Sequence, residues 1–336
     1  YDFIYLEQDI ITTYLTQGWL INLSQMMAYN SELVSKDFES QDERFEDFTS
    51  FIDHFRDATG DVFGIPFEAF LKTYVYRKDL FEDPEIQQAF YAKYGWTLKP
   101  PEDWTQYTQI AKFFTEWGKE QGIELYGHTA QAKTHPCIAY EMSESIWPAW
   151  GIWNWGINME TWKATSANGG TLDSDRAKEA LAWYVDMLQY APPGVKTYTW
   201  DESAAAMASG KVAQGLIYGE NTAWIATNPD RSNVTGKIGV ALPPLHHDVE
   251  IETAVVFGYN AKRTGEGYVG YYDGGAFGIP VSAKNPEAAL LFLQFVARKE
   301  WAPEFAALAA RVVRKSTFNS QLVQEMDPKV DGYYSL

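Results

Sequence analysis

Hydrophobic and polar positions along the chain follow two periods, one typical of strands and one typical of helices. Residues 1–6 (YDFIYL) alternate as a half-buried strand does, and residues 10–17 have the spacing of a short helix that ends at Gly18. The pattern predicts two more extended segments, at 62–66 and 71–77. Helical spacing predicts further helices at these ranges: 43–58, 103–119, 134–150 and 174–190.

Capping residues mark the helix boundaries in the second half of the chain. Ser174 is a favourable N-cap, Thr199 and Glu202 form a capping box, and Asn285 stands before Pro286 at a first helical position. In the helix at 174–190, four residues share a face: Ala177, Leu181, Val185 and Leu188. The remaining predicted elements are strands at 211–218, 237–242 and 252–257 and helices at 285–298 and 303–313. Because strands alternate with helices, we expect an α/β fold with parallel sheets.

Length and charge narrow the class of protein. At roughly 150 residues per domain, 336 residues predict two domains. The formal charge is −18, from 27 Lys and Arg against 45 Asp and Glu, which would repel a phosphate backbone, so nucleic acid is not an expected partner. No run of about 18 apolar residues predicts a membrane span. The single cysteine, Cys137, excludes an internal disulfide and a CxxC metal site.

Aromatic residues make up 16% of the chain, with 13 Trp, 21 Tyr and 19 Phe. Indole N–H and phenol O–H groups need polar partners, so surplus Trp and Tyr favour wet, concave surfaces. The dense cluster from Trp147 to Trp155 is the most conspicuous case. This composition indicates a polar ligand with apolar faces, and the alternative is that many of these rings pack in the core.

Common nucleotide, metal and hydrolase motifs do not explain the chain. Gly265, Gly267 and Gly270 match G-x-G-x-x-G, but no helix is expected after them, so we reject a dinucleotide site. Phosphate-loop, H-E-x-x-H and G-x-S-x-G motifs are absent from the sequence. The adjacent His246 and His247 are better explained as a solvated pair than as metal ligands. We therefore expect no metal, no cofactor and no catalytic residue.

Carboxylates near aromatic residues are the remaining candidates for chemistry. Glu141 and Glu144 are three apart on an expected helix, whereas Glu220 and Asp273 lie in aromatic segments that contain glycine. Two such acids across a cleft can hydrolyse a glycoside, or they can only accept hydrogen bonds from hydroxyl groups. Binding without catalysis needs no tuning of a pKa and is the interpretation we favour.

Five segments, in order, resemble the extracytoplasmic solute-binding proteins of carbohydrate ABC importers, and the maltose-binding-like branch is the most similar. The segments begin at Tyr1 (YDFIYLEQDIITTYLTQGWLINLSQ), Asp61 (DVFGIPFEAFLKTYVYRKDLFED), Lys99 (KPPEDWTQYTQIAKFF), Thr197 (TYTWDESAAAMASGKVAQGLIYGEN) and Gly274 (GGAFGIPVSAKNPEAALLFLQFV). Each segment alone is weak evidence, but together they cover nearly the whole chain.

The resemblance implies a two-lobe periplasmic-binding-protein-like fold (type II), with a hinge between the lobes and the ligand in the interlobe cleft. It places 1–68 and 273–299 in the N-terminal lobe and 69–272 and 300–336 in the C-terminal lobe. Members usually open with a strand and a helix before the segment that resembles YDFIYL, so the first lobe is expected to lack them. The implied protein is a periplasmic or extracytoplasmic monomer, free or lipid-anchored, which delivers its ligand to membrane permease subunits.

The resemblance also implies ligand-binding positions, to which we add Glu144 and Trp147 from their aromatic surroundings. The expected ligand-binding residues are Gln8, Asp9, Glu68, Glu144, Trp147, Tyr218, Glu220, Trp224, Asp273, Gly274, Gly275 and Arg311. Arg311 has an alternative role, pairing with an acid of its own lobe. The expected ligand is a sugar, oligosaccharide or polyol. The alternatives are a glycoside hydrolase that uses two of Glu68, Glu144, Glu220 and Asp273, and an interaction module without a small ligand.

Overall fold

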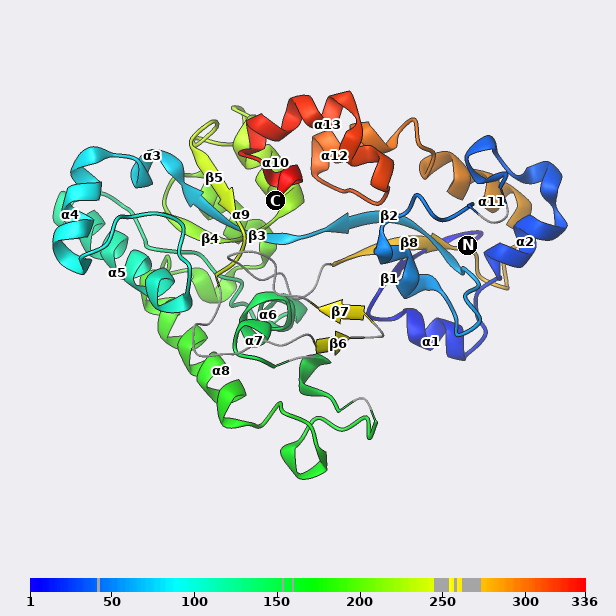
Figure 1. Cartoon of the computed structure of the whole chain (residues 1–336), viewed down its shortest axis with the longest axis horizontal. Helices are drawn as coiled ribbons and strands as arrows, with labels where there is room; N and C mark the ends of the chain where they lie inside the picture. Colours follow the sequence, from blue (N-terminus) through cyan, green and yellow to red (C-terminus); the bar gives the residue numbers. More distant parts are fainter. Residues whose placement is uncertain (41–42, 153, 159, 245–253, 257–258, 262–272) are drawn as a thin grey trace. The chain divides into compact units, whose positions relative to one another are not determined.

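The computed structural model describes residues 1–336 except 41–42, 153, 159, 245–253, 257–258 and 262–272. The chain forms two compact units, and each consists of two separate stretches (Figure 1). Unit 1 comprises Tyr1–Phe70 and Asp273–Pro328, and unit 2 comprises Leu71–Tyr272 and Lys329–Leu336. Gly265, Gly267, Gly270, His246 and His247 lie outside the described residues.

Unit 1 is built on a three-stranded sheet in the order β1-β8-β2. Its strands and α-helices are β1 (Ile4–Glu7), α1 (Ile11–Thr16), α2 (Leu23–Tyr29), β2 (Gly64–Phe70), β8 (Asp273–Gly278), α11 (Pro286–Val296), α12 (Ala302–Ala309) and α13 (Gln321–Met326). Strand β8 lies in the middle, where Ala276 pairs with Leu6 on one side and with Pro66 on the other. Segments from the two ends of the chain therefore share one sheet (Figure 1).

Unit 2 contains a sheet in the order β4-β3-β5 and a two-stranded ribbon, β6-β7. Its strands are β3 (Lys72–Arg77), β4 (Gln214–Tyr218), β5 (Ile238–Ala241), β6 (Ala254–Val256) and β7 (Tyr259–Ala261). Its α-helices are α3 (Lys78–Phe81), α4 (Pro84–Tyr94), α5 (Trp104–Gln121), α6 (Pro136–Glu141), α7 (Trp147–Ala149), α8 (Asp175–Met187), α9 (Trp200–Ala208) and α10 (Gly219–Thr227). A π-helical turn, Met142–Ile146, joins α6 to α7.

The paired strands of both sheets and of the ribbon are antiparallel, so the expectation of parallel sheets was wrong. The path of the chain between the units explains why β2 and β8 are antiparallel. Strand β2 carries the chain out of unit 1 and β8 carries it back, so the two run in opposite directions where they pair.

Local capping rules held at several helix starts. The Asp103 carboxylate accepts a hydrogen bond from the Gln106 N–H at the start of α5, and Ser174 caps α8. Thr199 and Glu202 form the expected capping box of α9. These boundaries depend on neighbouring residues only, which is why the sequence predicts them.

Two predicted helices differ in the structure. Residues 43–58 form turns and one 3-10 helix, Ser50–Phe55, rather than a single α-helix. Phenylalanine is a weak helix former, and the Asp47 carboxylate accepts hydrogen bonds from the backbone N–H and hydroxyl of Ser316, so tertiary contacts override the helical spacing. The stretch 134–150 is helical but is interrupted by the π-helical turn.

The hydrophobic spacing of α8 predicted its buried face only in part. Leu181 and Val185 are exposed, whereas Ala180 and Tyr184 are among the residues that pack in the core of unit 2. That core is strongly aromatic. Trp104 and Trp150 are buried in it, and the ring of the partly buried Trp183 lies 4.8 Å from that of Trp104, centroid to centroid. Some tryptophans are therefore core residues, as the alternative interpretation of the composition held.

Residues 300–328 belong to unit 1, not to the lobe that contains 69–272 as expected. Arg314 explains this placement. Its side chain is fully buried, its Nη1 lies 3.1 Å from Asp47 Oδ2, and its Nε donates to the Ala297 carbonyl. The guanidinium also lies over the ring of Phe48, so this segment is bound to unit 1 by charge and by packing.

Candidate functional site

In unit 1, three side chains from separate segments form a polar cluster. The Tyr5 hydroxyl, on β1, donates a hydrogen bond of 2.5 Å to Glu68 Oε1, on β2. Arg311 Nη1, beyond the end of α12, lies 2.6 Å from Glu68 Oε2. The Glu68 side chain is 13% exposed and that of Arg311 31% exposed. Arg311 therefore pairs with an acid of its own unit, the alternative that the sequence left open.

Two glycines at the start of β8 allow this cluster to form. A Cβ atom at Gly275 would lie 2.3 Å from Cζ of Tyr5. A Cβ atom at Gly274, where φ is 147°, would lie 2.2 Å from the backbone oxygen of Glu68. The absence of a side chain at these two positions therefore leaves room for the Tyr5 ring and for the backbone of Glu68.

The turn after β1 brings further polar groups to the end of the same strand. Gln8 is buried and Asp9 is exposed. Partial desolvation raises the pKa of the preceding Glu7 carboxyl, with smaller contributions from the charges of Asp9 and Glu68. Asp273 is the first residue of β8, and its side chain lies outside the described part of the chain.

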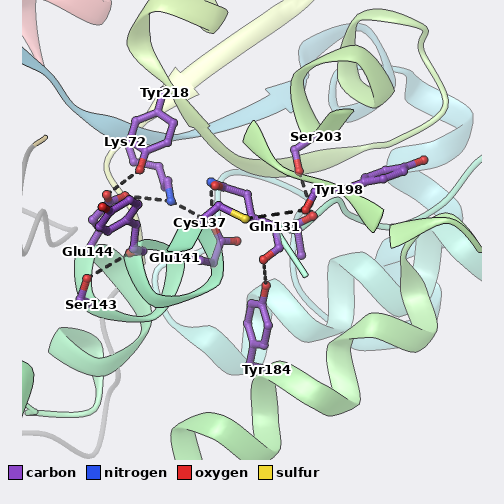
Figure 2. Close-up of polar contacts among 12 residues, drawn as sticks. Lys72, Gln131, Cys137, Glu141, Ser143, Glu144, Tyr184, Tyr198, Ser203 and Tyr218 are labelled. Carbon is purple, nitrogen blue, oxygen red and sulfur yellow. Dashed lines mark hydrogen bonds and ion pairs between the residues drawn. The ribbon is translucent and has the colours of Figure 1, made fainter. Parts of the chain in front are cut away.

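In unit 2, a buried charge network surrounds Lys72, the first residue of β3 (Figure 2). Its Nζ lies 2.9 Å from Glu141 Oε2 and 2.8 Å from Glu144 Oε2. The Tyr218 hydroxyl donates a hydrogen bond of 2.5 Å to Glu144 Oε1, and Gln131 Nε2 donates one of 3.0 Å to Glu141 Oε2. The Lys72 ammonium also lies 4.5 Å from the centroid of the Tyr218 ring. We call these five residues the Lys72 network.

Burial makes the electrostatics of this network strong. The side chains of Lys72, Glu141 and Glu144 are between 1% and 3% exposed. Burial alone would lower the pKa of the Lys72 ammonium, but the two carboxylates outweigh it and the pKa is raised. Lys72 is therefore charged, and the hydrogen bonds from Tyr218 and Gln131 help to offset the second carboxylate.

Sequence reasoning missed Tyr5, Lys72 and Gln131. A signal existed for Lys72, because it interrupts an apolar and aromatic run (AFLKTYVY). It is the first residue of the mostly buried strand β3, and a buried lysine needs carboxylate partners. Tyr5 and Gln131 carry no comparable signal, because their partners are set by tertiary contacts across 63 and 10 residues.

The remaining expected residues of unit 2 lie outside this network. Trp147 is half-buried, and its indole N–H has no hydrogen-bond partner within the described part of the chain. Trp224 donates its indole N–H to Asn221 Oδ1, and the Arg231 guanidinium lies 4.1 Å from its ring centroid. Glu220 is half-buried in the first turn of α10.

Metal sites and membrane spans are two further features to consider among the described residues. Among the described residues, no group of three or more His, Cys, Asp or Glu side chains is arranged to hold a metal ion. None of the helices that the structure describes combines the length and the apolar character needed to cross a membrane.

Residues 6–303 match the family of bacterial extracellular solute-binding proteins, so the chain belongs to this family. The match begins within β1 and includes most of unit 2 and two of the three crossings between the units, those after Phe70 and after Tyr272. The two-lobe α/β fold of these proteins is accordingly the fold of this chain.

Individual relatives are distant. The chain is 25% identical over 254 residues to a binding protein of Brucella abortus (strain 2308), covering 73% of this chain and 49% of that protein. The chain thus spans about half the length of the curated relatives it matches.

An ABC transporter solute-binding protein from Agrobacterium radiobacter K84, in complex with ribitol, has a similar structure. The TM-score is 0.73, with 19% identity over 100% of this chain and 73% of that one. Another, from Agrobacterium vitis S4 with bound D-mannitol, gives a TM-score of 0.70 at 22% identity over 98% and 68% of the two chains.

Proposed function

We propose that this protein is the substrate-binding component of an ABC importer that captures a neutral polyol or sugar and delivers it to membrane permease subunits. The observation that carries the proposal is the family match, which runs through both units. Solved structures of the same fold with bound ribitol and D-mannitol support a small, hydroxyl-rich ligand. We place the protein on the extracytoplasmic side of the membrane, where this family acts.

The charges of unit 1 favour an uncharged ligand. Arg311 is the cation of the polar cluster, and Glu68 already neutralises it at 2.6 Å. An anionic sugar would have to displace that carboxylate, whereas a hydroxyl group can donate to Glu68 without breaking the ion pair. The Arg311 side chain remains 31% exposed while it is paired with Glu68. We therefore assign Tyr5, Asp9, Glu68 and Arg311 to the ligand-facing surface of unit 1.

In unit 2 we assign Trp147 to the ligand-facing surface. Its half-buried indole offers an apolar face that suits the C–H groups of a polyol, whereas its N–H is buried and has no hydrogen-bond partner among the described residues. Glu144 and Tyr218 are buried in the Lys72 network. Their role is to hold this surface in place.

A thermal-shift screen tests the proposal directly. Ribitol, D-mannitol and maltose form one arm, and D-glucuronate and glycerol 3-phosphate form the other. Ligand at 100 times its dissociation constant adds about 2.7 kcal/mol to the free energy of unfolding, an easily detected rise in melting temperature. We expect a rise with at least one neutral compound. A rise with the anionic arm alone would refute the neutral-ligand assignment, and no rise with any compound would refute a role in polyol or sugar capture.

Incubation of the same preparation with chromogenic glycosides separates binding from hydrolysis. We expect no steady release of chromophore, because Glu68 and Glu144, two of the four candidate acids, are already bound to cations at 2.6 Å and 2.8 Å. Turnover that is lost in a Glu68→Gln or Glu144→Gln variant would establish a glycosidase instead.

A further inference from the structure

The helix that leads to Trp147 changes its hydrogen-bond pattern just before that residue. Helix α6 ends at Glu141, the π-helical turn covers Met142–Ile146, and the N–H of Trp147 donates to the carbonyl of Met142. A π-helical turn contains one more residue than the α-helical turn it replaces. The residues after it are therefore rotated by about 100° relative to an uninterrupted α-helix. The turn thus determines the side of the helix on which Trp147 lies.

Such a turn is intrinsically less favourable than α-helix, so it persists only where side chains stabilise it. Lys72 makes the relevant contacts. It bonds to Glu141, the last residue before the turn, and to Glu144, inside the turn. Tyr218, on the neighbouring strand β4, holds the second carboxylate oxygen of Glu144 (Figure 2). The Lys72 ammonium therefore links the end of α6 and the π-helical turn to strand β3.

We infer that Lys72 is a positioning residue: by pairing with both Glu141 and Glu144 it holds the π-helical turn in register and so sets the orientation of the Trp147 indole. The strength of the contacts supports this role, because all three charged side chains are almost completely buried and the ion pairs are not screened by water. The consequence for ligand affinity rests on the proposed function of Trp147. The consequence for its orientation does not.

The test is the ¹⁹F NMR spectrum of protein labelled with 5-fluorotryptophan, with the Trp147 signal assigned by its loss in Trp147→Phe. We expect Lys72→Met to shift or broaden the Trp147 signal, while the signal of a tryptophan in unit 1, such as Trp301, stays in place. Lys72→Arg, which keeps the charge, is expected to retain most of the wild-type signal position. An unchanged Trp147 signal in folded Lys72→Met protein would overturn the inference.

Lys78→Met is the matched control, because it is the same substitution in the same unit. Lys78 pairs with Asp331 at 2.7 Å and lies at the start of α3, so it is expected to leave the Trp147 signal unchanged. If Lys72→Met does not fold, Glu144→Gln replaces it. That variant keeps the Lys72–Glu141 pair but weakens the anchor inside the turn, so it too should shift the Trp147 signal, and no shift would overturn the inference.

A second readout connects the turn to binding. For whichever neutral compound raises the melting temperature, calorimetry should show about tenfold weaker binding to Lys72→Met and near wild-type binding to Lys78→Met. Equal affinities for the two variants would refute the link from Lys72 to ligand binding. If the wild-type protein binds none of the compounds, the proposed function fails, and the NMR experiment still decides the role of Lys72.

Discussion

At the scale of single residues, the polar cluster of unit 1 shows how one ion pair changes the charge of a surface. Arg311, taken alone, is a site for an anion. Paired with Glu68, which also accepts a hydrogen bond from Tyr5, it becomes part of a neutral surface that offers both donors and acceptors. Glu68 and Arg311 were expected from the sequence as site residues, but Tyr5 and the pairing of the three side chains were not.

Removing the Glu68 carboxylate should therefore change the ligand preference from neutral towards anionic compounds. We expect Glu68→Gln to weaken binding of a neutral polyol about tenfold, because a charged hydrogen-bond acceptor is lost. The same change leaves the Arg311 charge without its neutralising partner, so binding of D-glucuronate should become measurable. Titration calorimetry with both compounds checks this. Glu304→Gln, an exposed carboxylate of α12, is the control and should change neither affinity. A variant that loses the polyol without gaining the anion would argue against the role assigned to this ion pair.

At the scale of elements, several helices of unit 2 meet through buried polar side chains as well as through aromatic rings. His128 is one such junction. It is fully buried, one ring nitrogen lies 2.7 Å from the Met187 carbonyl at the end of α8, and the other lies 3.4 Å from the Tyr107 hydroxyl of α5. Burial lowers the pKa of His128 to about 4, against 6.5 for the exposed side chain, although its backbone contacts oppose the shift.

The pKa of His128 predicts part of the acid sensitivity of unit 2. The unfolded chain takes up a proton at this residue below pH 6.5, and the folded protein does so only near pH 4. Above pH 6.5, His128 is neutral in both states and does not reduce the free energy of unfolding. As the pH falls towards 4, protonation of the unfolded chain lowers that free energy by about 3 kcal/mol. Urea unfolding at pH 7 and pH 4.5 measures this loss. In His128→Gln the loss should be smaller by most of that amount, and an equal loss in both proteins would show that another group is responsible.

At the scale of the whole molecule, the path of the chain explains both the success and the error of the domain prediction. The family match runs from residue 6 to residue 303, through both units, and gives the two-lobe architecture. Residues 300–328 were assigned to the wrong unit, because their attachment depends on Arg314 and on its contacts with Asp47 and Phe48, far away in the sequence. No local pattern around Arg314 indicates those partners.

The proposed function makes one prediction for the molecule as a whole. If both units contribute residues to one ligand, binding will favour a closed form over an open one. Small-angle X-ray scattering should then give a smaller radius of gyration with a neutral compound that binds than without it. Addition of D-glucuronate is the control for solvent effects. An unchanged radius at saturating ligand would argue that one unit binds alone.

Local chemistry and motif order were enough to predict the family, the two-lobe α/β class, most helix and strand positions and the caps of α8 and α9. These features depend on residues close together in the chain, or on the order of segments along it. The direction of strand pairing, the π-helical turn before Trp147, the Lys72 network and the neutralisation of Arg311 by Glu68 were decided by the tertiary structure alone. Each of these joins residues from distant segments, and burial away from water makes their charges and hydrogen bonds strong enough to override local preference.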